Sequence, residues 1–190
     1  MNNNNAHHII IADNQPIVVK GLRSFFGAFP NLLVSGVAND GDELKMLLST
    51  RKVDTLIIDL KLPRTNTYRL IKDLVVLHSR VKIIAFTNYT MPKLVQDMME
   101  FGLSAYASKA APLNEIKDII EKVHNGEQFI SSSVYENERR ISNEIKESTL
   151  LQKDNFTRFT DLTEREMDII ILMSRGMTNK EMADKLQLSV

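Results

Sequence analysis

From His8 to about Asn125, short apolar runs alternate with longer segments of helical periodicity, and few folds accommodate this alternation. The short runs are rich in β-branched or aromatic residues and are too short for helices, so we expect them to be strands. They lie at Ile9–Ala12, Leu32–Val34, Thr55–Ile58, Val81–Phe86 and Ser104–Ala107. Because each run is continuously apolar, the strands are expected to be buried on both faces of a parallel sheet.

The segments between these runs have the spacing of amphipathic helices. They lie at Pro16–Phe29, Asp40–Ser49, Thr67–His78, Pro92–Phe101 and Leu113–Asn125. Strands that alternate with helices in this way predict an α/β fold with a doubly wound, five-stranded parallel sheet. Right-handed crossovers would place the functional crevice at the carboxyl ends of the strands.

The character of the chain changes after Gly126, and this divides it into four parts. We expect a disordered tail at residues 1–7, the α/β domain at residues 8–126, a polar linker at residues 127–160 and a small all-α unit at residues 161–190. The tail assignment rests on the asparagine run at Asn2–Asn5, and the linker assignment on a stretch rich in Glu, Asn, Lys and Arg with few apolar anchors.

Composition excludes several classes of protein. The 190 residues carry 24 Lys and Arg against 24 Asp and Glu, so any contact with nucleic acid must be local. The absence of cysteine rules out disulfide scaffolds, thiolate metal sites and thiol catalysis. The apolar runs are much shorter than the ~20 residues of a membrane span. The N-terminus does not have the pattern of a signal peptide, so we expect a soluble, cytoplasmic protein without a membrane partner.

The chemically informative residues lie where the expected strands end. Asp13 and Asn14 follow the first strand, Asp59 ends the third, Thr87 ends the fourth and Lys109 follows the fifth. In a parallel sheet these positions converge. The two carboxylates can hold Mg²⁺ through oxygen ligands, and Asp59 can attack phosphorus as a nucleophile. The lysine and the hydroxyl would then stabilise the oxygens of the transferred group.

Four sequence blocks resemble the signature blocks of receiver domains from two-component response regulators. They are Ile10–Pro16, Ile57–Pro63, Phe86-Thr87 and Tyr106–Lys109. The resemblance covers His8 to about Gly126 and implies a flavodoxin-like receiver. It also implies that the chain is no enzyme beyond phosphotransfer to, and dephosphorylation of, its own aspartate.

The resemblance also implies roles for individual residues. Asp59 would be the phosphoacceptor, Thr87 the switch hydroxyl, Lys109 the lysine that pairs with phosphate, and Tyr106 the switch aromatic, although core packing explains Tyr106 about equally well. The Mg²⁺ ligands would be Asp13, Asn14, Asp59 and the backbone carbonyl of Lys61.

Asn14 departs from the family pattern, which usually has two consecutive acidic residues after the first strand. The site loses one negative charge, so we expect Mg²⁺ to bind more weakly than at an Asp-Asp site. Asn14 also leaves open an alternative function, a degenerate receiver that acts as a phosphorylation-independent interaction module. An α/β phosphohydrolase is disfavoured because Lys61 stands where a general acid would follow the nucleophile.

The four histidines are expected to have structural roles, since none has a second ligand at metal-binding spacing. They are His7, His8, His78 and His124.

The C-terminal unit is predicted to form two helices joined by a short turn. Capping boxes begin at Thr163 and Thr178, and Gly176 lies between them. The segment from Leu162 to Val190 resembles the start of a LuxR-type (NarL/FixJ) helix-turn-helix domain, whose recognition helix would follow Ser189.

We therefore expect a response regulator truncated before its recognition helix. The alternative is a natural chain that ends early and binds DNA weakly or not at all. The candidates for DNA contact within the chain are Thr178, Asn179 and Lys180. The expected partners are a sensor histidine kinase or a small phosphodonor, a second copy of the chain in a homodimer, and DNA for the full-length protein.

Overall fold

A computed structural model describes residues 6–135, 169, 172 and 179–186 of the chain. The chain divides into two compact units, Met1–Ile145 and Lys146–Val190.

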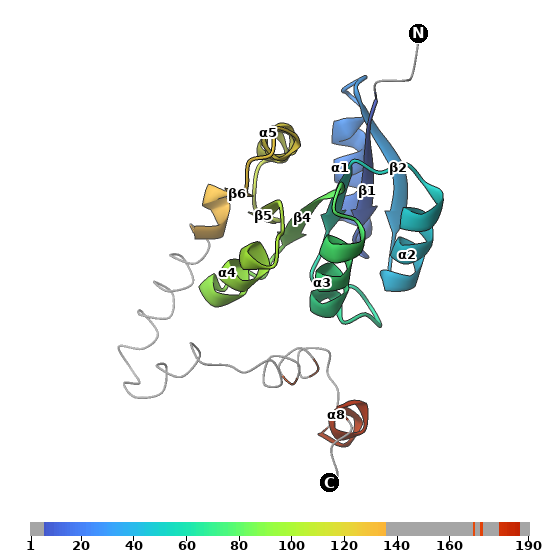
Figure 1. Cartoon of the computed structure of the whole chain (residues 1–190), viewed down its shortest axis with the longest axis vertical. Coiled ribbons are helices and arrows are strands. Elements are labelled where there is room, and N and C mark those ends of the chain that lie inside the picture. The colour runs from blue at the N-terminus through green and yellow to red at the C-terminus, as the bar shows by residue number, and fades with distance from the viewer. Residues whose placement is uncertain (1–5, 136–168, 170–171, 173–178, 187–190) are drawn as a thin grey trace. The chain divides into compact units, whose positions relative to one another are not determined.

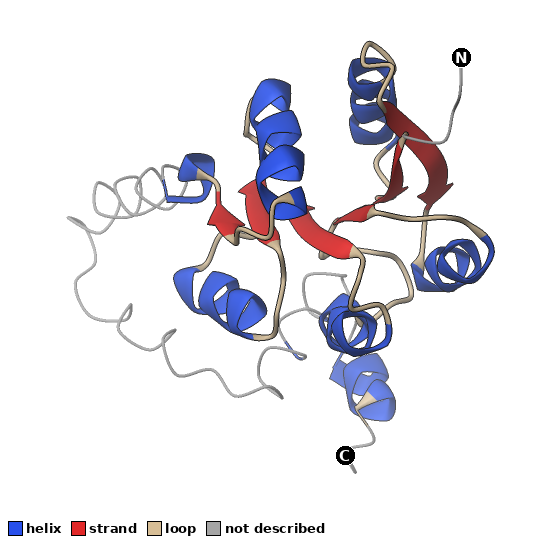
Figure 2. Cartoon of the chain, turned by 45° about the horizontal axis from the view of Figure 1, so that its top comes forward, coloured by secondary structure: helices blue, strands red, loops and turns tan. Residues whose placement is uncertain are grey.

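The N-terminal unit is built around a six-stranded sheet in which all neighbouring strands run parallel. The strands are β1 (His7–Ala12), β2 (Leu32–Ala38), β3 (Thr55–Ile58), β4 (Lys82–Thr87), β5 (Ala105–Ser108) and β6 (Phe129–Ile130). They lie in the order β2-β1-β3-β4-β5-β6. Figure 2 shows the strands in red and the helices in blue. The chain therefore reverses its direction of winding between β1 and β3, which is where ligand sites form in such sheets.

Helices cover both faces of this sheet (Figure 1). They are α1 (Pro16–Phe26), α2 (Gly41–Thr50), α3 (Thr67–Leu77), α4 (Pro92–Glu100) and α5 (Leu113–His124). Apolar residues of α1 and α5 belong to one hydrophobic cluster, and those of α2, α3 and α4 belong to the other. The doubly wound parallel fold predicted from the sequence is thus confirmed.

Alternation within the strands explains why the apolar runs are continuous. In β1, Ile9 and Ile11 pack on the side of α1 and α5, whereas Ile10 and Ala12 pack on the side of the other three helices. All four side chains are fully buried. At these four positions the strand is covered on both faces, so a polar side chain there could not reach water.

The sheet has one strand more than the five predicted from the sequence. Phe129 pairs with Ala105 and Ile130 pairs with Tyr106, so β6 extends the sheet beyond β5. The segment is fixed further by the backbone N–H of Ser131, which donates to the carbonyl of Tyr106 at 2.9 Å. Two half-buried residues make too short an apolar run to stand out in the sequence, where they fell within the expected linker.

Several expected boundaries differ from the structure by a few residues. Strand β2 ends at Ala38 rather than Val34. His7, assigned above to the disordered tail, is the first residue of β1 and pairs with Leu32. Helix α1 ends at Phe26 rather than Phe29. Proline at position 30 disfavours helical backbone in the residue before it, which is consistent with the earlier end.

The described part of the C-terminal unit contains α8 (Asn179–Lys185). Its position agrees with the second helix predicted for this unit. Met182 of α8 is buried. Ile169 and Leu172 are also helical and fall within the first predicted helix. The capping-box residues Thr163 and Thr178 and most of the expected linker lie outside the described residues.

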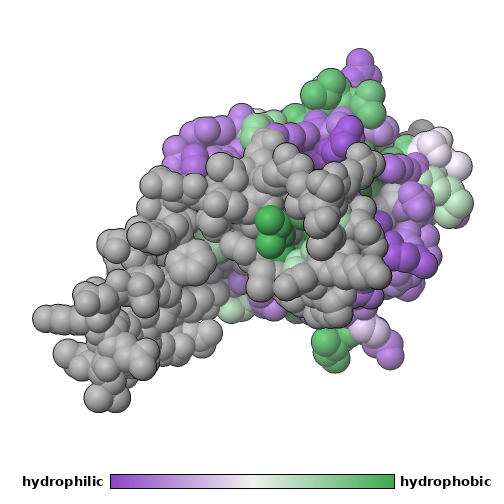
Figure 3. All heavy atoms as spheres, turned by 90° about the horizontal axis from the view of Figure 1, so that it is seen from below, coloured by the Kyte–Doolittle hydropathy of each residue, from purple (hydrophilic) through white to green (hydrophobic). Residues whose placement is uncertain are grey.

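On the face seen in Figure 3, hydrophilic residues (purple) lie beside separate apolar patches (green). The most exposed large apolar side chains are Ile17, Val76 and Leu77. Within the described ranges, no helix combines the length and the apolarity needed to cross a membrane.

Candidate functional site

Three residues that follow strands are fixed in place by the backbone ladder of the sheet. The N–H of Asp13 donates to the carbonyl of Ala38 at 3.0 Å. The N–H of Asp59 donates to the carbonyl of Ala12 at 2.8 Å, and the N–H of Lys109 donates to the carbonyl of Thr87 at 2.9 Å. Parallel pairing thus continues one residue beyond the strands, so the three side chains start from a rigid edge.

The side chains of these residues meet in one buried cluster. The Lys109 ammonium lies 2.7 Å from Oδ2 of Asp13 and 2.6 Å from Oδ2 of Asp59. The exposed fractions of the side chains are 6% for Lys109, 3% for Asp13 and 4% for Asp59. The sequence predicted this convergence. Two carboxylates share a single ammonium, which leaves the cluster with one net negative charge.

Backbone N–H groups hold the second oxygen of each carboxylate. Oδ1 of Asp13 accepts from the N–H of Gln15 at 2.8 Å. Oδ1 of Asp59 accepts from the N–H of Lys61 at 3.2 Å. Each carboxylate is therefore fixed in orientation by two different donors, one on each oxygen. A nucleophile held in this way needs little rearrangement before it reacts.

Burial raises the pKa of the Asp13 carboxyl above its ordinary value. Hydrogen bonds from Lys109 and from the Gln15 N–H, together with the charge of Lys109, favour the carboxylate and oppose this shift. The negative charge of Asp59 adds to the shift. A group whose charged form is disfavoured by burial gains from a cation in contact with it.

Thr87 and Tyr106 lie beside the charged cluster, and both contact Tyr89 in the loop between β4 and α4. The N–H of Tyr89 donates to Oγ1 of Thr87 at 3.3 Å. The hydroxyl of Tyr106 donates to the Tyr89 carbonyl at 2.5 Å. Thr87 and Tyr106 are both fully buried. Burial, with a smaller contribution from the Asp59 charge, raises the pKa of the Tyr106 phenol far above its usual range.

Asn14 and Lys61 are at the rim of the cluster and both are exposed. Mg²⁺ binds hard oxygen donors, and these two positions could add an amide oxygen and a backbone carbonyl to the carboxylates of Asp13 and Asp59. The two carboxylates already converge on one cation, the Lys109 ammonium, so their spacing fits a shared ion. Among the described residues, no group of three His, Cys, Asp or Glu could hold a metal ion by itself.

Gln15 is a site residue that sequence reasoning missed. Its side-chain oxygen Oε1 accepts from the Lys109 ammonium at 3.3 Å. The residue lies directly before Pro16, the first residue of α1. Its position one residue after the Asp13-Asn14 pair could have marked it, because the whole turn lies at the carboxyl edge of the sheet.

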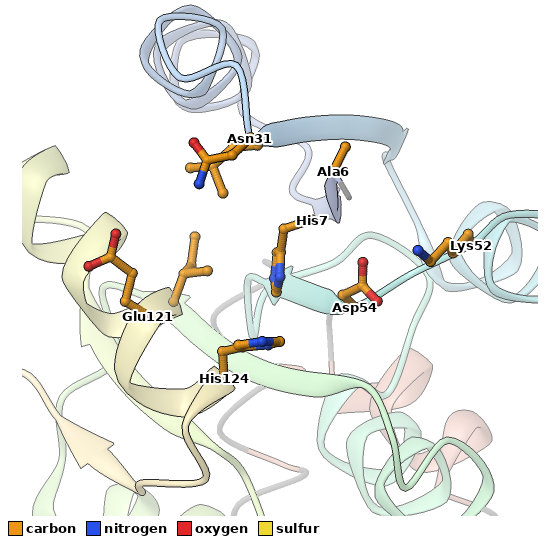
Figure 4. A pocket seen from close by; sticks show the side chains of 9 residues that line it. Ala6, His7, Asn31, Lys52, Asp54, Glu121 and His124 are labelled. Carbon is orange, nitrogen blue, oxygen red and sulfur yellow. The ribbon is translucent and has the colours of Figure 1, made fainter. Parts of the chain in front are cut away.

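A separate pocket of about 340 Å³ lies at the opposite, amino-terminal edge of the sheet (Figure 4). His7 and His124 face each other there edge to face, with ring centroids 5.2 Å apart. Nε2 of His7 is 2.8 Å from Oγ1 of Thr55. The sequence predicted a structural role for these histidines but not that they would meet, since they are 117 positions apart (124 minus 7).

The residues named above as candidates for DNA contact are only partly described. Asn179 and Lys180 begin α8, whereas Thr178 lies outside the described residues.

Comparison with known families identifies the N-terminal unit. Residues 9–121 match the response regulator receiver domain. The chain belongs to the response regulator receiver family. The matched range contains all four sequence blocks on which the resemblance was based and ends within α5.

Individual response regulators are similar over most of the chain. Response regulator UvrY of Escherichia coli (strain K12) is 25% identical over 182 residues, which cover 96% of this chain and 80% of UvrY. Transcriptional regulatory protein LiaR of Bacillus subtilis (strain 168) is 28% identical over 182 residues, covering 96% of this chain and 83% of LiaR.

The fold is shared with solved structures. RcsB from Salmonella enterica serovar Typhimurium, bound to promoter rprA, matches with a TM-score of 0.70 at 22% identity and covers 97% of this chain and 85% of RcsB. Its isolated receiver domain matches with a TM-score of 0.65 at 24% identity, covering 70% of this chain and 99% of that domain.

Proposed function

We propose that this receiver is a phosphorelay switch in which Asp59 accepts a phosphoryl group and thereby controls DNA binding. The observation that carries the proposal is the 2.6 Å contact between the Lys109 ammonium and Oδ2 of Asp59, inside a cluster that also contains Asp13. A buried carboxylate held beside a fixed cation suits attack on a phosphoryl group, whose oxygens carry negative charge that the cation can neutralise.

The reaction is a transfer of the phosphoryl group to an Asp59 carboxylate oxygen. That oxygen attacks phosphorus, and the bond from phosphorus to the donor's leaving group breaks as the new phosphorus–oxygen bond forms. The leaving group departs with the electron pair of the broken bond; it is imidazole for a histidine kinase phosphohistidine and acetate for acetyl phosphate. Hydrolysis by water later returns the carboxylate and releases inorganic phosphate, so the chemistry is confined to the protein's own Asp59.

Asp13, Asn14, Asp59 and the backbone carbonyl of Lys61 are the residues that would hold Mg²⁺. The ion would neutralise charge on the transferred phosphoryl group. Lys109 supplies the protein's own positive charge, since its ammonium already contacts Asp59.

Thr87 and Tyr106 would carry the state of Asp59 to the surface. In the described arrangement Oγ1 of Thr87 holds the N–H of Tyr89, and Tyr106 holds the carbonyl of the same residue. Drawing the Thr87 hydroxyl toward a phosphoryl group would release the N–H and shift the β4–α4 loop. Such a change, driven by a local charge, can bias a two-state element.

The proposed output is a change in homodimerisation and in docking of a LuxR-type effector in the C-terminal unit, with transcription as the regulated process. The description of the relative LiaR as a transcriptional regulatory protein supports this output. We place the relay in the cytoplasm, with a sensor histidine kinase or a small phosphodonor upstream.

The test is intact-mass spectrometry after incubation with acetyl phosphate and Mg²⁺. The wild-type chain is expected to gain one phosphoryl adduct, and Asp59→Asn none. Thr87→Ala retains the acceptor, so it should still be modified, though its dimerisation should no longer respond. An unmodified wild-type chain would overturn the proposal.

A second candidate function is a degenerate receiver that binds partners without phosphorylation. Asn14 favours it, because an amide replaces a carboxylate that would attract the metal. The same experiment separates the two functions. If the wild-type chain forms no adduct while Asn14→Asp does, the degenerate-receiver function is supported.

A further inference from the structure

The Lys109 ammonium has three donor hydrogens, and the structure gives it three acceptors. Two are the carboxylates of Asp13 and Asp59, at 2.7 and 2.6 Å. The third is the uncharged side-chain oxygen of Gln15, at 3.3 Å. An ammonium this deeply buried needs all its donors satisfied, so Gln15 completes the set.

The two carboxylates cannot hold Lys109 in the same way throughout the proposed cycle. Once phosphorylated, Asp59 is an acyl phosphate, so the negative charge beside Lys109 moves from its carboxylate oxygens to the phosphoryl group. Asp13 would share its oxygens with a divalent cation that repels the ammonium. The Gln15 oxygen carries no charge and takes no part in the reaction, so its contact with Lys109 can stay the same throughout the cycle.

The position of Gln15 in the helix supports a role other than capping. It is the N-cap residue of α1, yet its side chain makes no capping hydrogen bond. Ser, Thr, Asp and Asn are the residues that cap well, whereas Gln is not among them. Pro16 follows at the first helical position, where it lacks an N–H that would need a cap. The Gln15 side chain is therefore free to turn toward Lys109.

Gln15 also holds Asp13, through its backbone. Its N–H donates to Oδ1 of Asp13 at 2.8 Å, while Oδ2 of the same carboxylate contacts Lys109. One residue thus fixes the orientation of the carboxylate with its main chain and the ammonium with its side chain. This double contact ties the start of α1 to the charged cluster.

We propose that Gln15 is a positioning residue for phosphotransfer, which keeps the Lys109 ammonium directed at the Asp59 site while both carboxylates change partners. The inference rests on the proposed function of Asp59 and Lys109. It predicts that removing the Gln15 acceptor slows phosphotransfer at saturating Mg²⁺ and leaves the affinity for Mg²⁺ within about twofold. A loss of about tenfold in rate corresponds to one weakened hydrogen bond to a charged group.

Three substitutions in the full chain separate positioning from capping. Gln15→Met keeps the length of the side chain and removes its acceptor. Gln15→Ser supplies a good cap but is too short to reach Lys109. Gln15→Glu keeps an acceptor at the same reach. We expect phosphorylation by acetyl phosphate to slow about tenfold in the Met and Ser variants and to stay within about threefold of wild type in the Glu variant.

A second readout does not depend on phosphorylation. In ¹⁵N-detected NMR of the metal-free protein, the Lys109 Nζ ammonium signal should be protected from solvent exchange in wild type and in Gln15→Glu. It should be broadened or lost in Gln15→Met and Gln15→Ser. This readout still tests Gln15 if the wild-type chain proves not to accept a phosphoryl group, so failure of the two proposals can be told apart.

Two results would overturn the proposal. One is an unchanged Lys109 ammonium signal in Gln15→Met. The other is a Gln15→Ser variant that is phosphorylated as fast as wild type, which would show that residue 15 serves only the start of α1. Thermal unfolding of each variant shows whether slower phosphorylation results from loss of the folded state.

Discussion

The hydroxyl of Tyr106 donates to the backbone carbonyl of Tyr89 at 2.5 Å, and this bond ties β5 to the loop between β4 and α4. Tyr106 is fully buried and packs in the hydrophobic cluster that also contains Val95 and Met98 of α4. The loop that contacts Thr87 is therefore also anchored from the core.

This bond predicts the effect of Tyr106→Phe. The substitution keeps the ring in the core and leaves the Tyr89 carbonyl without its donor, so the free energy of unfolding should fall by about 1 kcal/mol. Tyr106→Ala should cost about 3–5 kcal/mol because it also leaves a cavity. Urea unfolding followed by circular dichroism measures both. Equal losses for the two variants would contradict this prediction, because the hydroxyl alone would then account for the contribution of Tyr106 to the free energy of unfolding.

Asn14→Asp tests the charge of the metal site. Adding a carboxylate beside Asp13 and Asp59 should strengthen Mg²⁺ binding by about tenfold, because a hard cation is attracted by each additional negative oxygen ligand. Isothermal titration calorimetry of wild type and variant gives the two dissociation constants. Asn14→Ser, which adds no charge, is the control and should bind Mg²⁺ no more tightly than wild type. Equal affinity of the wild type and Asn14→Asp would contradict this account of the site.

Lys109→Met tests the buried charge cluster through stability. The variant leaves two adjacent carboxylates without their ammonium, so we expect a loss of about 3 kcal/mol at neutral pH. Burial already raises the pKa of Asp13, and removal of the cation raises it further. Protonation of Asp13 should therefore relieve its repulsion with Asp59 as the pH falls. The difference in the free energy of unfolding between Lys109→Met and wild type should become smaller between pH 7 and pH 5.

The matched control for this prediction is the double variant Lys109→Met with Asp13→Asn, in which the carboxylate pair is removed. The double variant should lose less free energy of unfolding than Lys109→Met at neutral pH, and its difference from wild type should change little on acidification. Urea unfolding at each pH provides the measurement. A gap between Lys109→Met and wild type that is independent of pH would mean that the carboxylates do not repel each other.

His7 predicts a second pH dependence, at the other edge of the sheet. Burial lowers the pKa of His7, and the neighbouring His124, His8 and Lys52 lower it further, while Asp54 opposes them. The Thr55 hydroxyl contacts its ring, and Glu121 lines the same pocket. As the pH falls below about 6.5, the unfolded chain takes up the proton first, so the folded state loses stability until the pH reaches the lowered pKa.

The loss is expected to stay below about 1 kcal/mol because His7 is only half-buried. Comparing urea unfolding at pH 7.5 and pH 5.5 isolates it, since His7→Gln should lose less stability on acidification than wild type. His78→Gln, which removes a histidine elsewhere, should behave like wild type. If His7→Gln and wild type lose stability equally, the histidine is not responsible.

The sequence was sufficient to predict the features that depend on local pattern. Continuous apolar runs identified five of the strands, and the residues after them identified Asp13, Asp59 and Lys109 as neighbours. Features that depend on tertiary packing were missed. β6 is only two residues long, and it pairs with β5 through contacts between residues distant in sequence, such as the bond from the Ser131 N–H to the Tyr106 carbonyl. The contact of Gln15 with Lys109 and that of His7 with His124 join residues far apart in the chain, and no periodicity encodes such contacts.

Reductive trapping shows which residue of the chain accepts the phosphoryl group, and we expect it to be Asp59. Borohydride converts an aspartyl phosphate into homoserine, which peptide mass spectrometry can locate after treatment with acetyl phosphate and Mg²⁺. If Asp59 is the phosphoacceptor, homoserine should form at position 59 alone in the wild-type chain and should not form in Asp59→Asn. Homoserine at another position, or none in the wild-type chain, would contradict it.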